Sequence, residues 1–60
     1  MTTYPRAWLS RKQDGRKVIY VVEVPAAVDG QYKTVGSFDR IERAEEYAKR
    51  IAEKVVRIEV

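Results

Sequence analysis

β-favouring residues fill much of the first half of the chain, and two Asp-Gly pairs interrupt them. Asp14-Gly15 and Asp29-Gly30 supply the positive φ angles that tight hairpins require, and β-favouring residues flank each pair. The pattern therefore predicts three strands joined by hairpins. They are expected at about residues 6–12, 17–24 and 31–37.

From residue 39 the hydrophobic period becomes that of a helix. Apolar residues recur at steps of three and four, in the series Ile41, Ala44, Ala48, Ile51 and Val55. Asp39 is predicted to cap this helix, and Glu42 three residues later completes a pair that resembles a capping box. Two acid-first pairs at spacing four are expected to stabilise the polar face: Glu45 with Lys49, and Glu46 with Arg50.

The order of elements predicts an α+β fold, in which a three-stranded antiparallel sheet packs on one C-terminal helix (β-β-β-α). Residues 55–60 alternate and are rich in β-branched side chains, which is compatible with a short fourth strand. Sixty residues are enough for a single small domain, so residues 1–60 are assigned to one domain.

Side chains alternate across a strand, so each strand residue is assigned to one face of the sheet. Under the helix we expect Leu9, Tyr20, Val22, Val24 and Val35. The opposite face then carries Arg6, Trp8, Lys12, Lys17, Ile19, Val21, Glu23, Tyr32 and Thr34. That face mixes cations with aromatic and aliphatic groups, and it is too apolar to be a purely solvated surface. We therefore expect it to stay uncovered by the helix and to contact a partner.

The composition excludes most enzyme chemistry. The chain has no cysteine and no histidine, which removes disulfides, Cys/His zinc sites, catalytic thiols and imidazole bases. We expect no enzymatic activity, no catalytic residue, no metal site and no cofactor. No apolar stretch approaches the length of a membrane-spanning helix, so we expect a soluble cytoplasmic protein with no membrane partner.

The net charge of +3 is concentrated in the first half of the chain, where six basic residues stand against three acidic ones before residue 37. Five of those six fall within the first predicted hairpin: Arg6, Arg11, Lys12, Arg16 and Lys17. A localised basic surface is typical of proteins that bind polyanions, although a small domain also keeps some net charge for solubility. The cations around the first hairpin can bind phosphates by releasing counterions.

Two segments carry a resemblance to a known family. The sequences YVVEV at residues 20–24 and VGSFD at residues 35–39, with Glu42 and Ala44 after them, are similar to the plant ethylene-response-factor (apetala-type) DNA-binding domain. The same layout occurs in the amino-terminal arm-site-binding domains of phage tyrosine-recombinase integrases. The likeness covers about residues 6–54, most of the chain.

The resemblance implies a three-stranded sheet that lies in the major groove of DNA and touches phosphates and bases with its open face. It implies contacts for Arg6 and Glu23, and also for Tyr32 and Thr34, which stand where the family usually has Arg and Trp. Trp8, the single tryptophan, has two interpretations: it lies against sugar or base, or it closes the rim of the core.

Two functions remain open on this evidence. The first is a small intracellular module, of phage or mobile-element type, that docks its sheet on duplex DNA. The second is a protein-binding or self-associating module that uses the same face, for which Trp8, Ile19 and Val21 resemble the centre of an interface.

Overall fold

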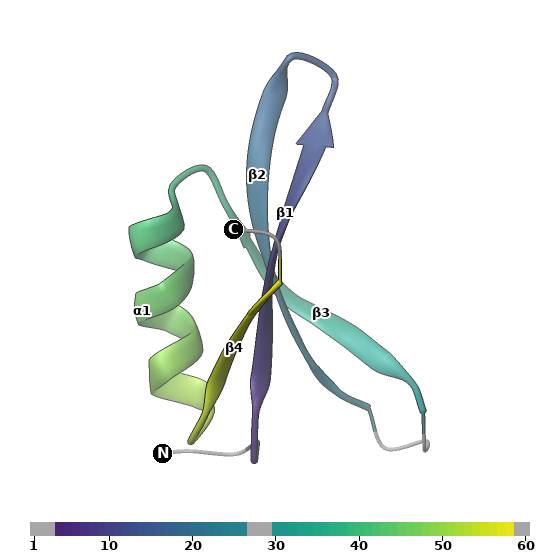
Figure 1. The fold of residues 1–60 in the computed structure, drawn as a ribbon, viewed down its shortest axis with the longest axis vertical. Helices are drawn as coiled ribbons and strands as arrows, with labels where there is room; N and C mark the ends of the chain where they lie inside the picture. The colour runs from purple at the N-terminus through teal and green to yellow at the C-terminus, as the bar shows by residue number, and fades with distance from the viewer. Residues whose placement is uncertain (1–3, 27–29, 59–60) are drawn as a thin grey trace.

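The computed structural model describes residues 4–26 and 30–58, and it has the α+β architecture that the sequence predicts. Figure 1 shows one helix lying on one side of a twisted sheet. The elements are β1 Ala7–Asp14, β2 Lys17–Pro25, β3 Tyr32–Phe38, α1 Ile41–Ile51 and β4 Val55–Ile58. The three predicted strands and the helix are confirmed, and each of the three strands ends slightly later than expected.

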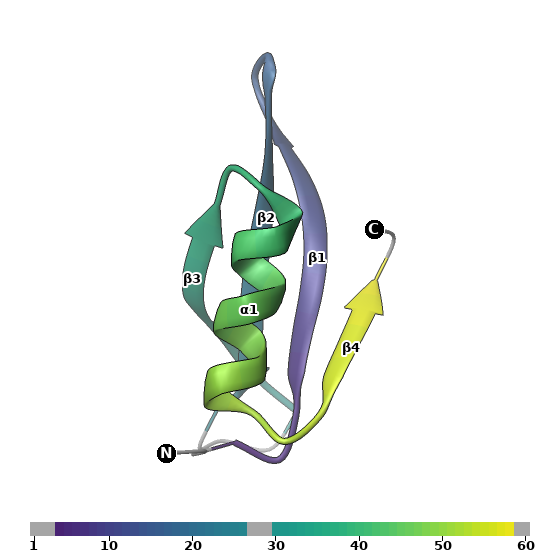
Figure 2. The same cartoon turned by 90° about the vertical axis from the view of Figure 1, so that its left-hand side faces the viewer.

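The fourth strand extends the sheet at the free edge of β1. The strand order is β3-β2-β1-β4; β2 is antiparallel to both of its neighbours, and β4 is parallel to β1. A parallel partner requires a crossover connection, and α1 provides it by passing over one face of the sheet between β3 and β4 (Figure 2). A strand near the C-terminus is thus confirmed, whereas residues 59–60 lie outside the described residues.

The turn between β1 and β2 is a two-residue loop of Gly15 and Arg16. Gly15 has a φ of +64°, in the left-handed region that favours glycine, and its carbonyl accepts a hydrogen bond from Gln13 Nε2 at 3.2 Å. Asp14 pairs with Lys17 as the last residue of β1, so the loop begins one residue later than the Asp-Gly pair suggested.

The pairing of β2 with β3 contains an irregularity beside a glycine. The register shifts between Val22 and Glu23, which marks a β-bulge next to Gly36. A Cβ atom on Gly36 would lie 2.9 Å from Phe38 Cε1 and 3.2 Å from Tyr47 Cε2. A side chain at this position would therefore have to displace one or both aromatic rings.

The start of α1 differs from the predicted capping box. Arg40 is the N-cap residue; its backbone is extended and its side chain makes no cap hydrogen bond. A cap side chain accepts hydrogen bonds from the N–H groups two or three positions after the N-cap. Asp39, the predicted cap, lies one residue before the observed N-cap. Glu42 lies in the first turn, where its negative charge still favours the helix dipole.

The end of α1 is set by contacts with the N-terminal segment. The amide of Tyr4 donates to the carbonyl of Ile51 at 3.1 Å, and the amide of Glu53 donates to the carbonyl of Tyr4 at 3.1 Å. These bonds satisfy a helix-terminal carbonyl and hold Ala52 in an extended conformation. Val55, the last member of the apolar helical series, consequently belongs to β4.

The core lies between α1 and the sheet. Ala44 and Ala48 are buried on α1, and Ala52 is buried just after it; the small side chains of the two helix residues allow the helix to approach the strands closely. The largest fully buried side chains come from the sheet: Leu9, Val22 and Val24. All the residues predicted to face the helix lie in or against this core: Leu9, Tyr20, Val22, Val24 and Val35.

The polar face of α1 carries the two predicted ion pairs. Lys49 Nζ lies 3.5 Å from Glu45 Oε1, and Arg50 Nη2 lies 2.9 Å from Glu46 Oε1. Glu45 also pairs with Arg57 of β4, which joins the helix to the edge of the sheet. No helix among the described residues is long and apolar enough to cross a membrane.

Candidate nucleic-acid interface

β1 and β2 continue beyond the rest of the sheet as a two-stranded ribbon, which comprises residues 11–19. β4 pairs with β1 only as far as Ser10, and β3 pairs with β2 only from Tyr20 onwards. The ladder between residues 11 and 19 therefore involves no third strand. Both views show the ribbon projecting past the end of the helix (Figures 1 and 2). Solvent consequently reaches both of its faces.

Basic side chains surround the ribbon, and all four are exposed: Arg11, Lys12, Arg16 and Lys17. The register places Lys12 and Lys17 on the face opposite α1, whereas Arg11 lies on the other face and Arg16 occupies the turn. Asp14 is the ribbon's one acidic residue. The ribbon thus presents positive charge on both faces and at its tip.

The face of the sheet opposite α1, called the open face below, contains the strand residues expected there. The cross-strand register groups Trp8, Lys12, Lys17, Ile19, Val21, Glu23, Tyr32 and Thr34 on it. β4 adds Val56 and Ile58, which pair with Trp8 and Ser10 and so share their side of the sheet. The alternation of residues 55–60 was visible in the sequence, but it did not reveal that β1 is the partner strand.

The centre of the open face is closed by the sheet's own side chains. Val21 is only 4% exposed although no helix lies over it, so the expectation that it is available to a partner is wrong. Trp8 and Ile19 are half-buried, and the Oγ atom of the neighbouring Ser10 is buried as well. β4 lies at the edge of the sheet and does not cross this face (Figure 1). The open face is therefore closed at Val21, and its exposed side chains include Lys12, Lys17, Tyr32, Thr34 and Ser37.

The end of the open face away from the ribbon is aromatic. Trp8 and Tyr32 pack edge to face, with ring centroids 4.6 Å apart and planes at 80°. Trp8 thus packs against Tyr32 on the open face and is not part of the core beneath the helix. Together with Glu23 and Ile58, the two rings line a hollow of about 220 Å³, called the aromatic hollow below.

The predicted contact residues fall into two separate groups. Arg6 lies just before β1, is exposed, and lines a second hollow of about 490 Å³ with Trp8 and Tyr32. Thr34 is exposed and pairs with Glu23. The first group is therefore Arg6, Trp8, Glu23, Tyr32 and Thr34, and the second is Arg11, Lys12, Arg16 and Lys17. From Lys17 to Glu23, β2 spans about 20 Å at roughly 3.4 Å per residue, which separates the two groups.

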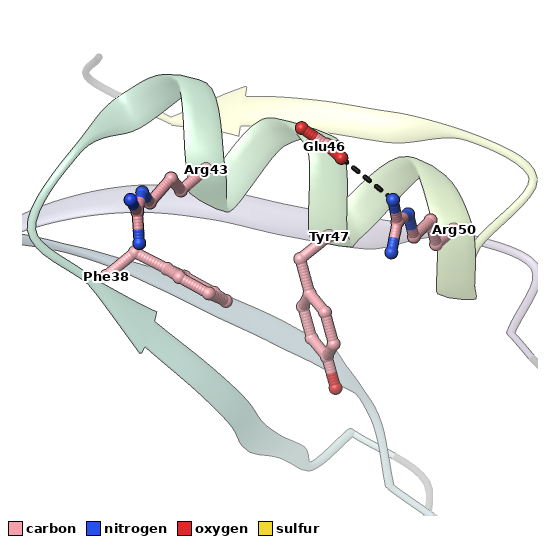
Figure 3. Close-up of a pocket in the computed structure, with 5 residues that line it drawn as sticks. All are labelled: Phe38, Arg43, Glu46, Tyr47 and Arg50. Atoms are coloured by element: carbon pink, nitrogen blue, oxygen red, sulfur yellow. Dashed lines mark hydrogen bonds and ion pairs between the residues drawn. The ribbon is translucent and has the colours of Figure 1, made fainter.

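Another hollow, of about 350 Å³, lies between α1 and the end of β3 and was not anticipated from the sequence. Figure 3 shows Arg43 and Arg50 on the helix, with Tyr47 between them pointing towards the sheet. The ring of Tyr47 lies 5.4 Å from that of Phe38 between centroids. Glu46 pairs with Arg50, so one guanidinium of this hollow is already neutralised.

Among residues 4–26 and 30–58, no group of three or more Asp or Glu side chains is placed to hold a metal ion. The strand residues gathered on the open face carry ammonium cations, aromatic rings, aliphatic side chains and the two carboxylates of Asp14 and Glu23.

Comparison with known proteins places the chain in no family: no family model matches it, and neither a curated protein nor a solved structure matches it significantly. The likeness to the ethylene-response-factor domain consequently depends on the short sequence segments alone. The parallel fourth strand is an element beyond the three strands and one helix of that layout.

Proposed function

We propose that this protein is a small DNA-binding module that inserts its ribbon into a groove of duplex DNA. The observation that supports the proposal is the projection of a two-stranded antiparallel ribbon with four exposed basic residues and one acidic residue. The major groove is wide enough to admit a two-stranded ribbon. Because cations lie on both faces and at the tip, phosphates on both sides of the groove are within reach.

The family resemblance implies that the whole sheet docks on DNA. In the mode proposed here, only the ribbon enters the groove. Glu23 lies at the aromatic end of the open face, and a carboxylate repels the phosphate backbone. The ribbon therefore supplies the positive surface, and the aromatic end is not required for affinity. The contacts are made to phosphates, which give affinity without reading the base sequence.

Salt-titrated binding to duplex DNA tests the proposal. With four phosphate contacts, the logarithm of the association constant is expected to fall with the logarithm of salt concentration at a slope of roughly −3 to −4. The double variant K12E/K17E is expected to halve this slope and to weaken binding by roughly 100-fold at about 0.1 M salt. Absence of measurable affinity for DNA at low salt contradicts the proposal.

A matched control is available at the other end of the sheet. Lys33 and Lys54 are exposed; Lys33 pairs with Val24, and the Lys54 carbonyl accepts a hydrogen bond from Ala7. The variant K33E/K54E makes the same change in net charge as K12E/K17E, but away from the ribbon. It is expected to retain most of the affinity, and an equal loss in both variants would show that only net charge matters.

Protein binding by the open face is a second candidate function. Tyr32 is 59% exposed and Ile58 is 42% exposed, and both lie beside the half-buried Trp8. Exposed apolar groups of this kind are typical of interaction sites. Sedimentation of the purified chain tests the self-associating form of this function: a dimer that loses stability in Y32A supports it, and a monomer at all concentrations contradicts it.

A further inference from the structure

We propose that the aromatic hollow binds the guanidinium group of an arginine side chain from a partner protein. This inference rests on the second candidate function, for which it names the partner's chemistry, and it does not require that the ribbon bind DNA. The hollow is lined by Trp8, Glu23, Tyr32 and Ile58.

The aromatic walls suit a cation. Trp8 and Tyr32 stand nearly perpendicular, at 80°, and both rings line the same hollow. The face of an aromatic ring carries partial negative charge, so a cation placed against it is attracted, and tryptophan is the strongest partner of this kind. Ile58 adds an apolar wall against which the aliphatic stem of a long basic side chain can pack.

The carboxylate of Glu23 gives the hollow its charge preference. Glu23 is half-buried, and its side chain has no ion pair or hydrogen bond with any residue in 4–26 or 30–58. A partly desolvated carboxylate is stabilised when a cation that can donate hydrogen bonds approaches it. A phosphate or carboxylate ligand is disfavoured at this position because its negative charge is repelled by that of Glu23.

The size of the hollow and the shapes of its walls favour arginine. At about 220 Å³, it is smaller than pockets that enclose drug-sized ligands, and it fits one side chain better than a whole metabolite. Guanidinium is planar, so it can stack on an aromatic face and donate two parallel hydrogen bonds to a carboxylate. A lysine ammonium is not planar and makes neither of these two contacts.

The sole tryptophan makes the site directly measurable. Emission of Trp8 in the full chain is followed while N-acetyl-arginine-amide is added at constant ionic strength, with N-acetyl-citrulline-amide as the uncharged isostere. We expect a saturable change in emission with the arginine compound at millimolar concentrations, and at least tenfold weaker binding of the citrulline compound. An equal response to both compounds overturns the proposal.

Two variants and one competing ligand complete the test. E23Q keeps the shape of the side chain and removes its charge, so it is expected to weaken arginine binding at least fivefold while the circular dichroism spectrum stays unchanged. Y32A, at an exposed position, is expected to weaken it similarly. Unchanged arginine binding in both variants overturns the proposal, as does tighter binding of adenosine, which would identify a surface for stacking nucleobases.

The outcome is independent of the DNA experiments. The titration reads the hollow directly, whereas the salt-dependent assay reads the ribbon, about 20 Å away along β2. If K12E/K17E loses DNA affinity and arginine binding persists, the two sites are separate. If arginine binding fails while DNA binding is observed, only the present inference is lost.

Discussion

Glu45 of α1 forms an ion pair with Arg57 of β4, and this contact links the crossover helix to the parallel edge strand that follows it. The two side chains are 23% and 53% exposed, so water screens their attraction. The pair orients β4 beside β1, but the backbone hydrogen bonds of the parallel ladder carry most of the attachment.

Replacing Arg57 with glutamine is therefore expected to lower the free energy of unfolding by less than about 1 kcal/mol. Urea denaturation at low and high salt measures the effect, and the difference from the wild type should shrink as salt is raised. A loss that is both larger and independent of salt would indicate that the arginine stem contributes through packing instead.

Gly36→Ala is expected to destabilise the fold by about 1–3 kcal/mol, because the added methyl group meets the rings of Phe38 and Tyr47. Thermal or urea unfolding measures the change. Ser37→Ala, at the exposed neighbouring position, is the matched control and should stay within about 0.5 kcal/mol of the wild type. Equal stability of Gly36→Ala and the wild type would show that the rings move aside freely.

Leu9→Ala is expected to cost about 2–5 kcal/mol, since Leu9 is fully buried beneath α1. A domain of this length has a total stability of about 3–9 kcal/mol at roughly 0.05–0.15 kcal/mol per residue, so the variant should lose a large part of its stability and unfold at a clearly lower temperature than the wild type. Circular dichroism measures the folded fraction. Leu9→Met conserves volume, and a cost below about 1.5 kcal/mol is expected for it.

Gly15→Ala is expected to weaken the ribbon by about 1–2 kcal/mol, because φ at this position is +64° and open space surrounds it. The cost comes from the backbone conformation and not from a clash. Gly15→Asn should recover much of the loss, since asparagine adopts positive φ more readily than alanine does. Amide hydrogen exchange within residues 11–19 distinguishes local fraying of the ribbon from global unfolding. Equal protection of these amides in the wild type, Gly15→Ala and Gly15→Asn contradicts this account.

The sequence was sufficient for the order and type of the first three strands and the helix, whereas it left the fourth strand open. β-favouring residues on either side of the two Asp-Gly pairs identified the strands, and the spacing from Ile41 to Ile51 identified the helix, because these patterns reflect local geometry. It also assigned Leu9 and Val22 correctly to the helix side, since alternation leaves only two faces to choose between. The helix termini were less predictable, since the backbone of Tyr4 sets one of them from far along the chain.

For the candidate sites, the sequence identified the residue types but not their grouping. The exposed cations of the ribbon follow from their positions around a tight turn. The meeting of Trp8 with Tyr32 and Ile58, by contrast, depends on the order of all four strands in the sheet.

The sequence alone determined the first three strands, the helix and the two faces, because each depends on the local pattern of residues, and it located the charge within the first hairpin. Only the tertiary structure decided that β4 pairs in parallel with β1, that Val21 is buried on the open face, and that two rings and a carboxylate form one hollow. These features depend on strand order and register, which are set by packing between segments distant in sequence.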